Sequence, residues 1–487
     1  MLYRKFSLAG RRNGIPLPPG PPPCWFWSNA LPAVNIAHAL TDLVREYGPV
    51  VSFRQGSQVI IVIGSVEAAM DIMEKEGGSL VDRPRSIAAG EMLSRGMRLL
   101  MARSGDRFRR LRKVIHTHLQ PKAAETYQDM QRENAKNFIL DILNDPNNHR
   151  EHTERYAISV ILRVTYGKSA PTANTDPEVI HIHKILEHFQ VAMRPGAYLV
   201  DRVPFCATCL VTENNLPSGI MMNYSYTDNN WGASRVKRGP SFAKMLLEHV
   251  EDHQLSTDEM SYLAGSLFGA GSDTANRCWN YRCYHGCGVP PLAQAKVHEE
   301  LDMVIGSDRA PAFKDSKLAS SVARVLVGSF EMETCRSYRQ DFPHRATKDI
   351  VWVSALDSCV TRILILFVSN QQGYSIPEGA TVYGCHWAIS RDPIVFPDPE
   401  TFNPQRWLDS EGRLKDNMKF IVYGFGRRVC PGLQPRQISQ CASTSHFSSG
   451  LSALLNDLTL LRSTRMPSVT MVISHAKLFE IDVSPRI

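Results

Sequence analysis

Several features that would assign this 487-residue chain to a common class are missing from it. No apolar run approaches the roughly 20 residues that a membrane-spanning helix needs. The eleven cysteines are odd in number and irregularly spaced, and no signal peptide precedes them. This pattern argues against a secreted disulfide framework and predicts reduced thiols. The formal charge of +7 is spread along the chain, so no nucleic-acid-binding arm is expected.

The first 23 residues are interpreted as a short basic N-terminus followed by a proline-rich spacer. Residues 15–23 read IPLPPGPPP, a composition that favours stiff polyproline II. The aromatic residues at 25–27 follow directly. They favour either peripheral contact with a membrane interface or packing on the protein that follows, and the sequence leaves both open.

The pattern of apolar residues predicts a mainly α-helical protein with a small β part. Residues 50–64, VVSFRQGSQVIIVIG, predict a β-hairpin that turns at the Gln-Gly-Ser in their middle. Ser256 and Glu259 have the spacing of a capping box, which predicts the start of a helix. Apolar residues at helical intervals predict further helices, over 123–144, 156–164 and 297–305.

The most informative stretch is YGFGRRVCPG at 423–432. Its first two glycines allow a tight backbone, its two arginines supply fixed positive charge, and Cys430 precedes a Pro-Gly pair. Such a loop can hold a thiolate against a metal. If a helix begins just after Cys430, its N-terminal amides would stabilise that anion. Thiolate ligation of haem favours cleavage of the O–O bond, which is oxygenase chemistry.

These residues resemble the haem-binding signature of the cytochrome P-450 family, Phe-x-x-Gly-x-Arg-x-Cys-x-Gly. Tyr423 stands where the family usually has Phe, whereas Gly426, Arg428, Cys430 and Gly432 match it position for position. The resemblance implies that Cys430 is the axial ligand of the haem iron and that Arg428 pairs with a haem propionate. The alternative is a glycine-rich surface turn with an ordinary thiol.

The stretch AGSDT at 270–274 is similar to the family's oxygen-activating segment in a long central helix. The resemblance implies that Gly271 makes room over the haem and that Asp273 and Thr274 relay protons. A simpler alternative is that Thr274 only bonds back to the helix backbone, as mid-helix threonines often do.

Three further charged residues match a structural network of the family, in which the charges fix the loop that bears the cysteine. Glu333 and Arg336 fit its Glu-x-x-Arg motif, and Arg406 lies in a segment similar to its Pro-x-Arg motif. A Glu-x-x-Arg pair taken alone is more often a pair on a helix surface.

The family also suggests two arginines as propionate contacts. Arg112 lies four residues after Phe108, where the family often shows Trp-x-x-x-Arg, and Arg345 lies in the segment PHRATKDI. Both could instead be solvated charges, and Arg109 and Arg110 compete with Arg112 for the role.

The resemblance therefore implies a single large haem domain over residues 24–487, with haem b (iron protoporphyrin IX) as cofactor. It implies a monooxygenase that inserts one atom of dioxygen into a small apolar organic substrate. Electrons would come from a separate NADPH-dependent reductase. In fungi and other eukaryotes the family is usually tethered to the endoplasmic reticulum membrane by an N-terminal helix, which is absent from this sequence. We therefore expect either a truncated start or peripheral contact with that membrane.

Parts of the chain depart from the family's pattern, at 206–237, 275–291, 353–372 and 433–465. Glycines and prolines interrupt the expected central helix after Thr274, and the segment after Gly432 is too polar for a buried helix. An inactive or mis-spliced haem-binding relic is therefore a second hypothesis. Residues 353–372 are interpreted as a translated intron, because their removal joins DIVW to GYSIPEGATVYG, a plausible pair of strands.

A third hypothesis assigns zinc to cysteines and a histidine of two atypical segments. Their spacing matches no standard zinc finger. The ligands would be Cys206, Cys209, Cys283, His285 and Cys287.

Overall fold

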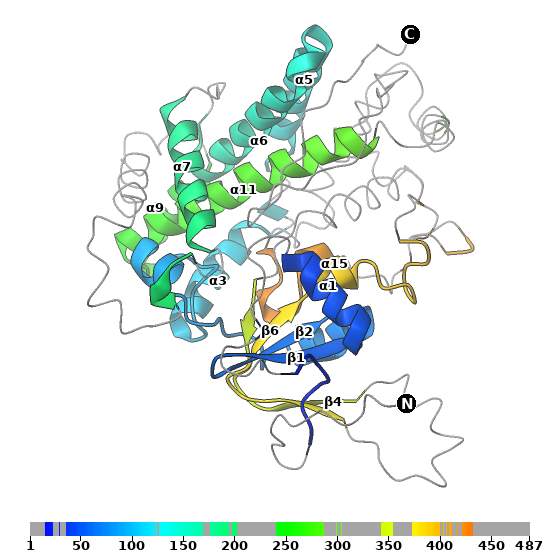
Figure 1. The fold of residues 1–487 in the computed structure, drawn as a ribbon. Coiled ribbons are helices and arrows are strands. Elements are labelled where there is room, and N and C mark those ends of the chain that lie inside the picture. The colour runs from blue at the N-terminus through cyan, green and yellow to red at the C-terminus, as the bar shows by residue number, and fades with distance from the viewer. Residues whose placement is uncertain are drawn as a thin grey trace. The chain divides into compact units, whose positions relative to one another are not determined.

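The computed structural model describes residues 15–22, 29, 36–120, 122–123, 126–168, 176–193, 197–201, 240–286, 299, 303, 342–353, 373–399, 403, 406, 409–411, 415 and 421–431. The chain divides into two compact units, which are described separately (Figure 1). Unit 1 comprises Met1–Arg85, Arg339–Thr401 and Phe420–Cys430. Unit 2 comprises Ser86–Tyr338, Phe402–Lys419 and Pro431–Ile487.

Unit 1 is built on a four-stranded sheet of order β1-β2-β6-β3. Strands β1 (Val50–Gln55) and β2 (Gln58–Ile63) pair antiparallel, and Gly56 turns between them at a φ of +60°. The hairpin predicted from the sequence is thereby confirmed. Strand β6 (Thr381–Gly384) lies parallel to β2, and β3 (His344–Arg345) completes the sheet antiparallel to β6.

A second, two-stranded sheet of unit 1 pairs β4 (Ile350–Trp352) with β5 (Tyr374–Ile376) antiparallel. Trp352 lies opposite Tyr374 in the register, and the two rings stack with centroids 6.3 Å apart. The two strands are therefore the arms of one hairpin, although 21 sequence positions separate the paired aromatic residues.

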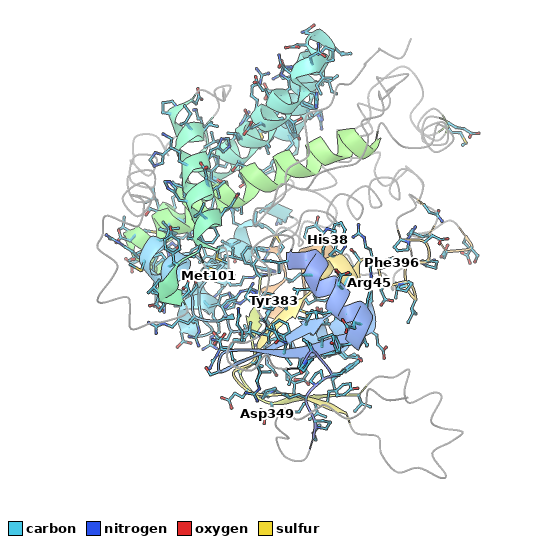
Figure 2. All side chains as sticks on the ribbon, viewed as in Figure 1. His38, Arg45, Met101, Asp349, Tyr383 and Phe396 are labelled. Atoms are coloured by element: carbon cyan, nitrogen blue, oxygen red, sulfur yellow. The ribbon has the colours of Figure 1, made fainter. Side chains whose placement is uncertain are left out.

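Helix α1 (Ile36–Tyr47) covers the larger sheet of unit 1 together with α15 (His386–Ile389). The apolar faces of these elements meet in a buried cluster, formed by Leu40, Val51, Phe53, Ile60, Val62, Cys385 and Ala388. Figure 2 labels His38 and Arg45 on α1 and Tyr383 on β6. The continuous apolar run of β2, Ile60–Ile63, is explained by burial of both faces of the strand.

Unit 2 is helical, and its longest helix, α11 (Thr257–Gly286, 30 residues), packs along α6 (His149–Tyr166). The capping box predicted at its start is confirmed, because the Ser256 amide donates to Glu259 Oε2 and the Glu259 amide to Ser256 Oγ, both at 3.2 Å. The backbone remains helical through Gly286, so the interruption expected after Thr274 does not occur before that residue.

The other helices of unit 2 surround this pair. They are α3 (Asp106–His118), α5 (Gln128–Asn144), α7 (Pro177–Ala192), α9 (Phe242–Glu248) and α10 (Val250–His253). Apolar residues of α3, α7 and α9 join those of α6 and α11 in a core cluster of the unit, which includes Leu111, Ile158, Leu162, Phe242, Leu263 and Phe268. The helices predicted within 123–144 and 156–164 are confirmed by α5 and α6. Of the one predicted over 297–305, only residues 299 and 303 are described, and both are helical.

Short elements complete the two units. In unit 1 they are α2 (Val66–Ala68), η2 (Ala69–Lys75), η9 (Ile421–Tyr423) and η10 (Gly426–Arg428); in unit 2 they are η3 (Ile87–Leu93), η4 (Pro146–Asn148) and η5 (Leu199–Asp201). Among the helices that the structure describes, none combines the length and the hydropathy needed to cross a bilayer.

Candidate functional site

The cysteine loop at 423–430 belongs to unit 1 and is closed by its own backbone. The amide of Cys430 donates a hydrogen bond of 2.8 Å to the carbonyl oxygen of buried Tyr423. Between them, Gly424 and Gly426 adopt φ angles of +82° and +57°, a region that favours glycine. The tight backbone predicted from the two glycines is therefore confirmed, and it presents the cysteine at the end of the loop.

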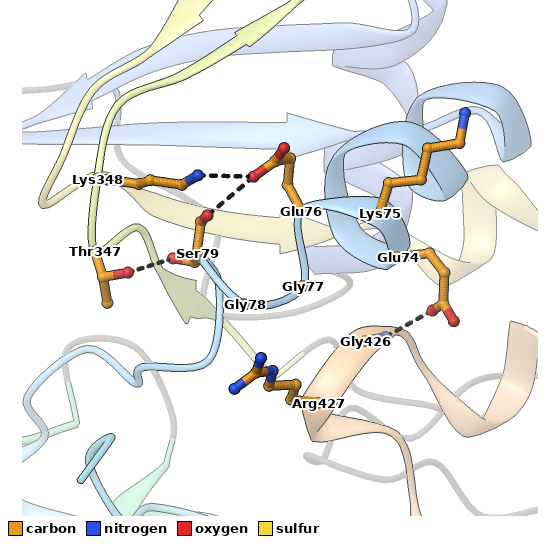
Figure 3. A pocket seen from close by; sticks show the side chains of 10 residues that line it. All are labelled: Glu74, Lys75, Glu76, Gly77, Gly78, Ser79, Thr347, Lys348, Gly426 and Arg427. Carbon is orange, nitrogen blue, oxygen red and sulfur yellow. Dashed lines mark hydrogen bonds and ion pairs between the residues drawn. The ribbon is translucent and has the colours of Figure 1, made fainter.

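Gly426 is also required by the close approach of a second segment. Its amide donates to Glu74 Oε2 at 2.7 Å (Figure 3). A Cβ atom at position 426 would lie 2.7 Å from the carbonyl oxygen of Met73 and 2.8 Å from Cα of Gly77, closer than real Cβ contacts come. Gly77 is thus a second glycine of the site, which the sequence interpretation missed because its partner is distant along the chain.

A pocket opens beside this contact, and Figure 3 shows the side chains around it. Lys348 pairs with Glu76 at 3.2 Å, and Glu76 also accepts a hydrogen bond from the Ser79 hydroxyl at 3.0 Å. The lining is completed by Glu74, Lys75, Gly77, Gly78, Thr347, Gly426 and Arg427. Because these residues are mostly charged or small, the pocket does not suit an apolar substrate.

Two cysteines are among the side chains that the structure describes, Cys385 and Cys430, and their surroundings differ. Cys385 is fully buried beneath α1, and its sulfur lies 3.6 Å from both Thr41 Oγ1 and the carbonyl oxygen of Ala37. Cys430 is partly exposed at the end of its loop. A buried thiol in such a core is usually inert, so the geometry favours Cys430 as a metal ligand.

Positively charged and basic side chains gather around residues 80–83 of unit 1. Arg428 Nε donates to the carbonyl oxygen of Val81 at 2.7 Å. Arg83 Nη1 donates to the carbonyl oxygens of Phe342 and Pro343 at 2.9 and 2.8 Å. His344 Nδ1 lies 2.7 Å from the carbonyl oxygen of Leu80 and donates to it. The loop arginine is therefore accompanied by an arginine and a histidine from distant parts of the chain.

The pKa of His344 is affected by the basic side chains around it. Burial, together with the positive charges of Arg83 and Arg428, lowers its pKa to about 3. A negative group bound among these side chains would reverse that repulsion. The two propionates of a haem are such groups, so a thiol on a tight loop and three neighbouring basic side chains fit haem b.

Arg83 and His344 were not among the predicted propionate contacts. The sequence signal for His344 was its position directly before Arg345, which was chosen instead. In the structure Arg345 Nη1 pairs at 3.3 Å with Asp82, a carboxylate that is only 2 % exposed. Arg345 thus already has a protein carboxylate as its partner. The structure therefore supports the propionate role more strongly for His344 than for Arg345.

Arg112 lies on α3 of unit 2. Its side chain is half-buried, whereas its two competitors, Arg109 and Arg110, are exposed. Arg109 moreover pairs with Asp106 on the same helix. Of the three arginines, Arg112 is the one placed to contact a buried group, and its propionate role stays a prediction.

The AGSDT stretch lies within α11 of unit 2. A Cβ atom at Gly271 would lie 2.5 Å from the side chain of Ile161 on α6, so this glycine permits close packing of the two helices. That packing role differs from the predicted one, which was to make room over a haem. Ser272 is buried and bonds back to the carbonyl oxygen of Gly269 at 3.3 Å. The side chains of Asp273 and Thr274 lie outside the described part of the structure.

The remaining predicted residues are described only in part. Arg406 Nε donates to the carbonyl oxygen of Asn403 at 3.2 Å, while Glu333, Arg336 and Gly432 lie outside the described residues. No group of three potential metal ligands occurs among the described side chains. The side chains proposed for zinc, at 206, 209, 283, 285 and 287, lie outside them.

Comparisons with known proteins agree with the cysteine loop. The family model described as cytochrome P-450 matches residues 18–322 and 369–434. Cytochrome P-450 monooxygenases 64 and 88 of Postia placenta are each 41 % identical to the chain over 444 residues, covering 89 % of it and 84 % of each relative. Monooxygenase 113 of the same fungus is 40 % identical over 439 residues, covering 87 % of this chain and 82 % of the relative.

Proposed function

Because this chain belongs to the cytochrome P-450 family, whose cofactor is haem b, we propose that it is a monooxygenase. The proposed reaction inserts one atom of dioxygen into a small apolar organic substrate. The observation that carries the proposal is the loop at 423–430, which presents Cys430 while Arg83, His344 and Arg428 gather nearby in the same unit. The names of the relatives support the reaction type.

The residues of the site have distinct proposed roles. When bound through a thiolate, haem b supplies the activation of dioxygen. Cys430 supplies that thiolate, and the backbone bond to Tyr423 fixes its position. Arg428, Arg83 and His344 hold the propionates. Asp273 and Thr274 are proposed to relay protons from solvent toward the substrate side of the haem.

Electrons are proposed to come from a separate NADPH-dependent reductase, as is general in the family. We further propose that the enzyme works at the surface of the endoplasmic reticulum membrane, in peripheral contact with it. A reconstituted assay tests the first point: purified protein and NADPH should consume dioxygen and an apolar substrate only when a reductase is added.

The competing hypothesis is an inactive relic, and the comparisons give it no support. A carbon monoxide difference spectrum of the reduced protein distinguishes the relic from the enzyme. A thiolate-type Soret band is expected, whereas failure of purified, folded protein to take up haem would favour the relic.

The hairpin of β4 and β5 bears on which form of the chain is active. Trp352 and Tyr374 are paired, and the tightest common hairpins leave two residues between paired positions. Removal of 353–372, the segment interpreted as an intron, would leave Gly373 alone, which is too short. Removal of 353–371 leaves Gln372-Gly373, a two-residue turn with glycine at its second position.

We therefore propose that the active enzyme lacks residues 353–371. Most of this segment, residues 353–368, lies within the stretch 323–368 that the family match leaves without a counterpart. Two tests apply. Transcripts should contain a form in which the Trp352 codon is followed by that of Gln372, and protein from that transcript should bind more haem than the full chain. Abundant mature message that encodes 353–371, with no shorter form, would contradict the proposal.

A further inference from the structure

The pocket beside the cysteine loop has no part in the proposed oxygenation, and all of its lining belongs to unit 1. Its volume is about 700 Å³, which is in the range of binding sites for small molecules. A polar ligand with negative charge suits the lining, because its basic side chains outnumber the acidic ones. The basic side chains are Lys75, Lys348 and Arg427, and the acidic ones are Glu74 and Glu76.

Both acidic side chains of the lining already have partners within the protein. Glu74 Oε2 accepts the amide of Gly426 at 2.7 Å. Glu76 Oε2 pairs with the ammonium group of Lys348 at 3.2 Å and accepts the hydroxyl of Ser79 at 3.0 Å (Figure 3). The hydrogen bonds from Lys348 and Ser79 lower the pKa of Glu76, so this carboxylate is ionised at neutral pH. Neither carboxylate therefore needs a cation from a ligand.

Arg427 differs from the other charged residues of the lining. Its side chain is exposed, and its guanidinium has neither a hydrogen bond nor an ion pair among the residues that the structure describes. The side chain extends toward Gly78, where a Cβ atom would lie 3.8 Å from both Nε and Nη2 (Figure 3). The amide of exposed Gly78 likewise donates to no acceptor in the described part of the chain. A guanidinium fork beside a glycine amide suits a phosphate group.

The pocket shares a wall with the cysteine loop. Arg427 directly follows Gly426, whose amide is held by Glu74, and directly precedes Arg428, one of the proposed propionate contacts. A ligand that fixes Arg427 therefore also restrains the loop that ends at Cys430. Because coupling between two bound ligands is reciprocal, such a ligand should in turn slow the loss of haem.

We propose that this pocket binds a phosphate group, with Arg427 and the Gly78 amide as donors, and that its occupancy stabilises the cysteine loop. The volume is larger than a phosphate ion alone would fill, which favours the phosphate ester of a polar molecule as the ligand. The site itself does not depend on the proposed monooxygenase reaction. Its effect on the loop is measured through bound haem.

Isothermal titration calorimetry of the haem-loaded protein tests the site with three probes: adenosine monophosphate (AMP), inorganic phosphate and adenosine. The variants are Arg427→Gln, which removes the charge, and Arg427→Lys, which keeps the charge but loses the planar fork. Arg45→Gln is the matched control, because Arg45 is an exposed arginine of unit 1 that lies on α1 and does not line the pocket.

AMP should bind to wild type, inorganic phosphate should bind more weakly, and adenosine should not bind measurably. Arg427→Gln should weaken AMP binding at least about tenfold, because a charge-assisted pair is lost, and Arg427→Lys should weaken it less. Arg45→Gln should bind AMP as wild type does. Saturating AMP should slow the transfer of haem to a haem-free acceptor protein at least about twofold in wild type, but not in Arg427→Gln.

Wild-type affinity for AMP in Arg427→Gln would overturn the site, even if that variant accepted electrons from a reductase more slowly, because Arg427 would then belong to a protein contact. Equal affinity for adenosine and AMP would also overturn it, since the phosphate group would contribute nothing. Equal affinity for phosphate and AMP would support the site with the free ion as its ligand.

The two parts of the proposal and the proposed function fail in different ways. AMP binding without any change in haem transfer would overturn the stabilisation of the cysteine loop. AMP binding by folded protein that takes up no haem would support the phosphate site and would contradict the proposed function.

Discussion

The two units hold their parts of the proposed site by different means. In unit 1 the cysteine loop is determined by its main chain, since Gly426 combines a φ of +57° with backbone atoms of Met73 and Gly77 where a side chain would be. In unit 2, Gly271 has ordinary helical geometry, and the atoms near it belong to the side chain of Ile161. A motif imposed by backbone geometry tolerates little change, whereas a motif within a helix can be accommodated by repacking.

The largest effect is expected for Gly426→Ala. An alanine would be strained at this φ and would also contact the backbone of the neighbouring segment, which cannot move aside easily. The free energy of unfolding should fall by about 3 kcal/mol or more, and haem uptake should be lost. Urea denaturation and the haem content of purified protein check this. A variant with wild-type stability would remove the contrast between the two glycines.

Buried histidines give a second contrast between the units. His118 of unit 2 lies between the rings of Tyr127 and Phe242, and burial lowers its pKa to about 4 from an ordinary 6.5. Because the unfolded chain then binds more protons between pH 6.5 and 4, this contribution to stability is complete above pH 6.5 and is lost as the pH falls toward 4. At pH 5 the loss is about 2 kcal/mol.

Replacing His118 by Phe should flatten the acid side of the stability profile, while His249→Gln, at an exposed histidine, should leave it unchanged. Urea denaturation at several pH values measures both.

His344 of unit 1 should behave differently, because bound propionates would raise its pKa. Bound haem should therefore reduce the part of the stability loss at low pH that is due to His344. If stability falls with pH in the same way with and without haem, the proposal that Arg83, His344 and Arg428 hold the propionates is contradicted.

A smaller effect is expected for Arg428→Gln. It removes one of the positive charges proposed to hold the propionates but leaves the loop backbone intact. Haem affinity should fall about tenfold, or about 1.4 kcal/mol, with the thiolate-type band retained. Titration of the protein with haem measures this. Arg427→Gln, at the exposed neighbouring arginine, is the control and should bind haem as wild type does.

The smallest effect is expected for Gly271→Ala, at about 1 kcal/mol or less. Alanine favours the helix, and the end of the Ile161 side chain can shift to make room. The double variant Gly271→Ala with Ile161→Val should recover stability relative to the single variant. If the single change costs as much as Gly426→Ala, the helix contact is as rigid as the cysteine loop.

Features set by residues close together in the chain could be predicted from the sequence, whereas features set by contacts between distant segments could not. The hairpin at 50–64, the capping box of α11 and the tight cysteine loop were readable, because each depends on residues close together in the chain. Gly77, Arg83 and His344 were missed, since their neighbours at 426, 342–343 and 80 come from distant segments. The packing of Gly271 on Ile161 depends on how α6 and α11 contact each other, and this contact cannot be predicted from the AGSDT stretch alone.

The central claim is that Cys430, and not the buried Cys385, is the thiolate ligand of the haem. Carbon monoxide difference spectra of the reduced variants Cys430→Ala and Cys385→Ala test it most directly. The account predicts that Cys430→Ala loses the thiolate-type Soret band and that Cys385→Ala keeps it. A thiolate-type band that survives Cys430→Ala would contradict the account.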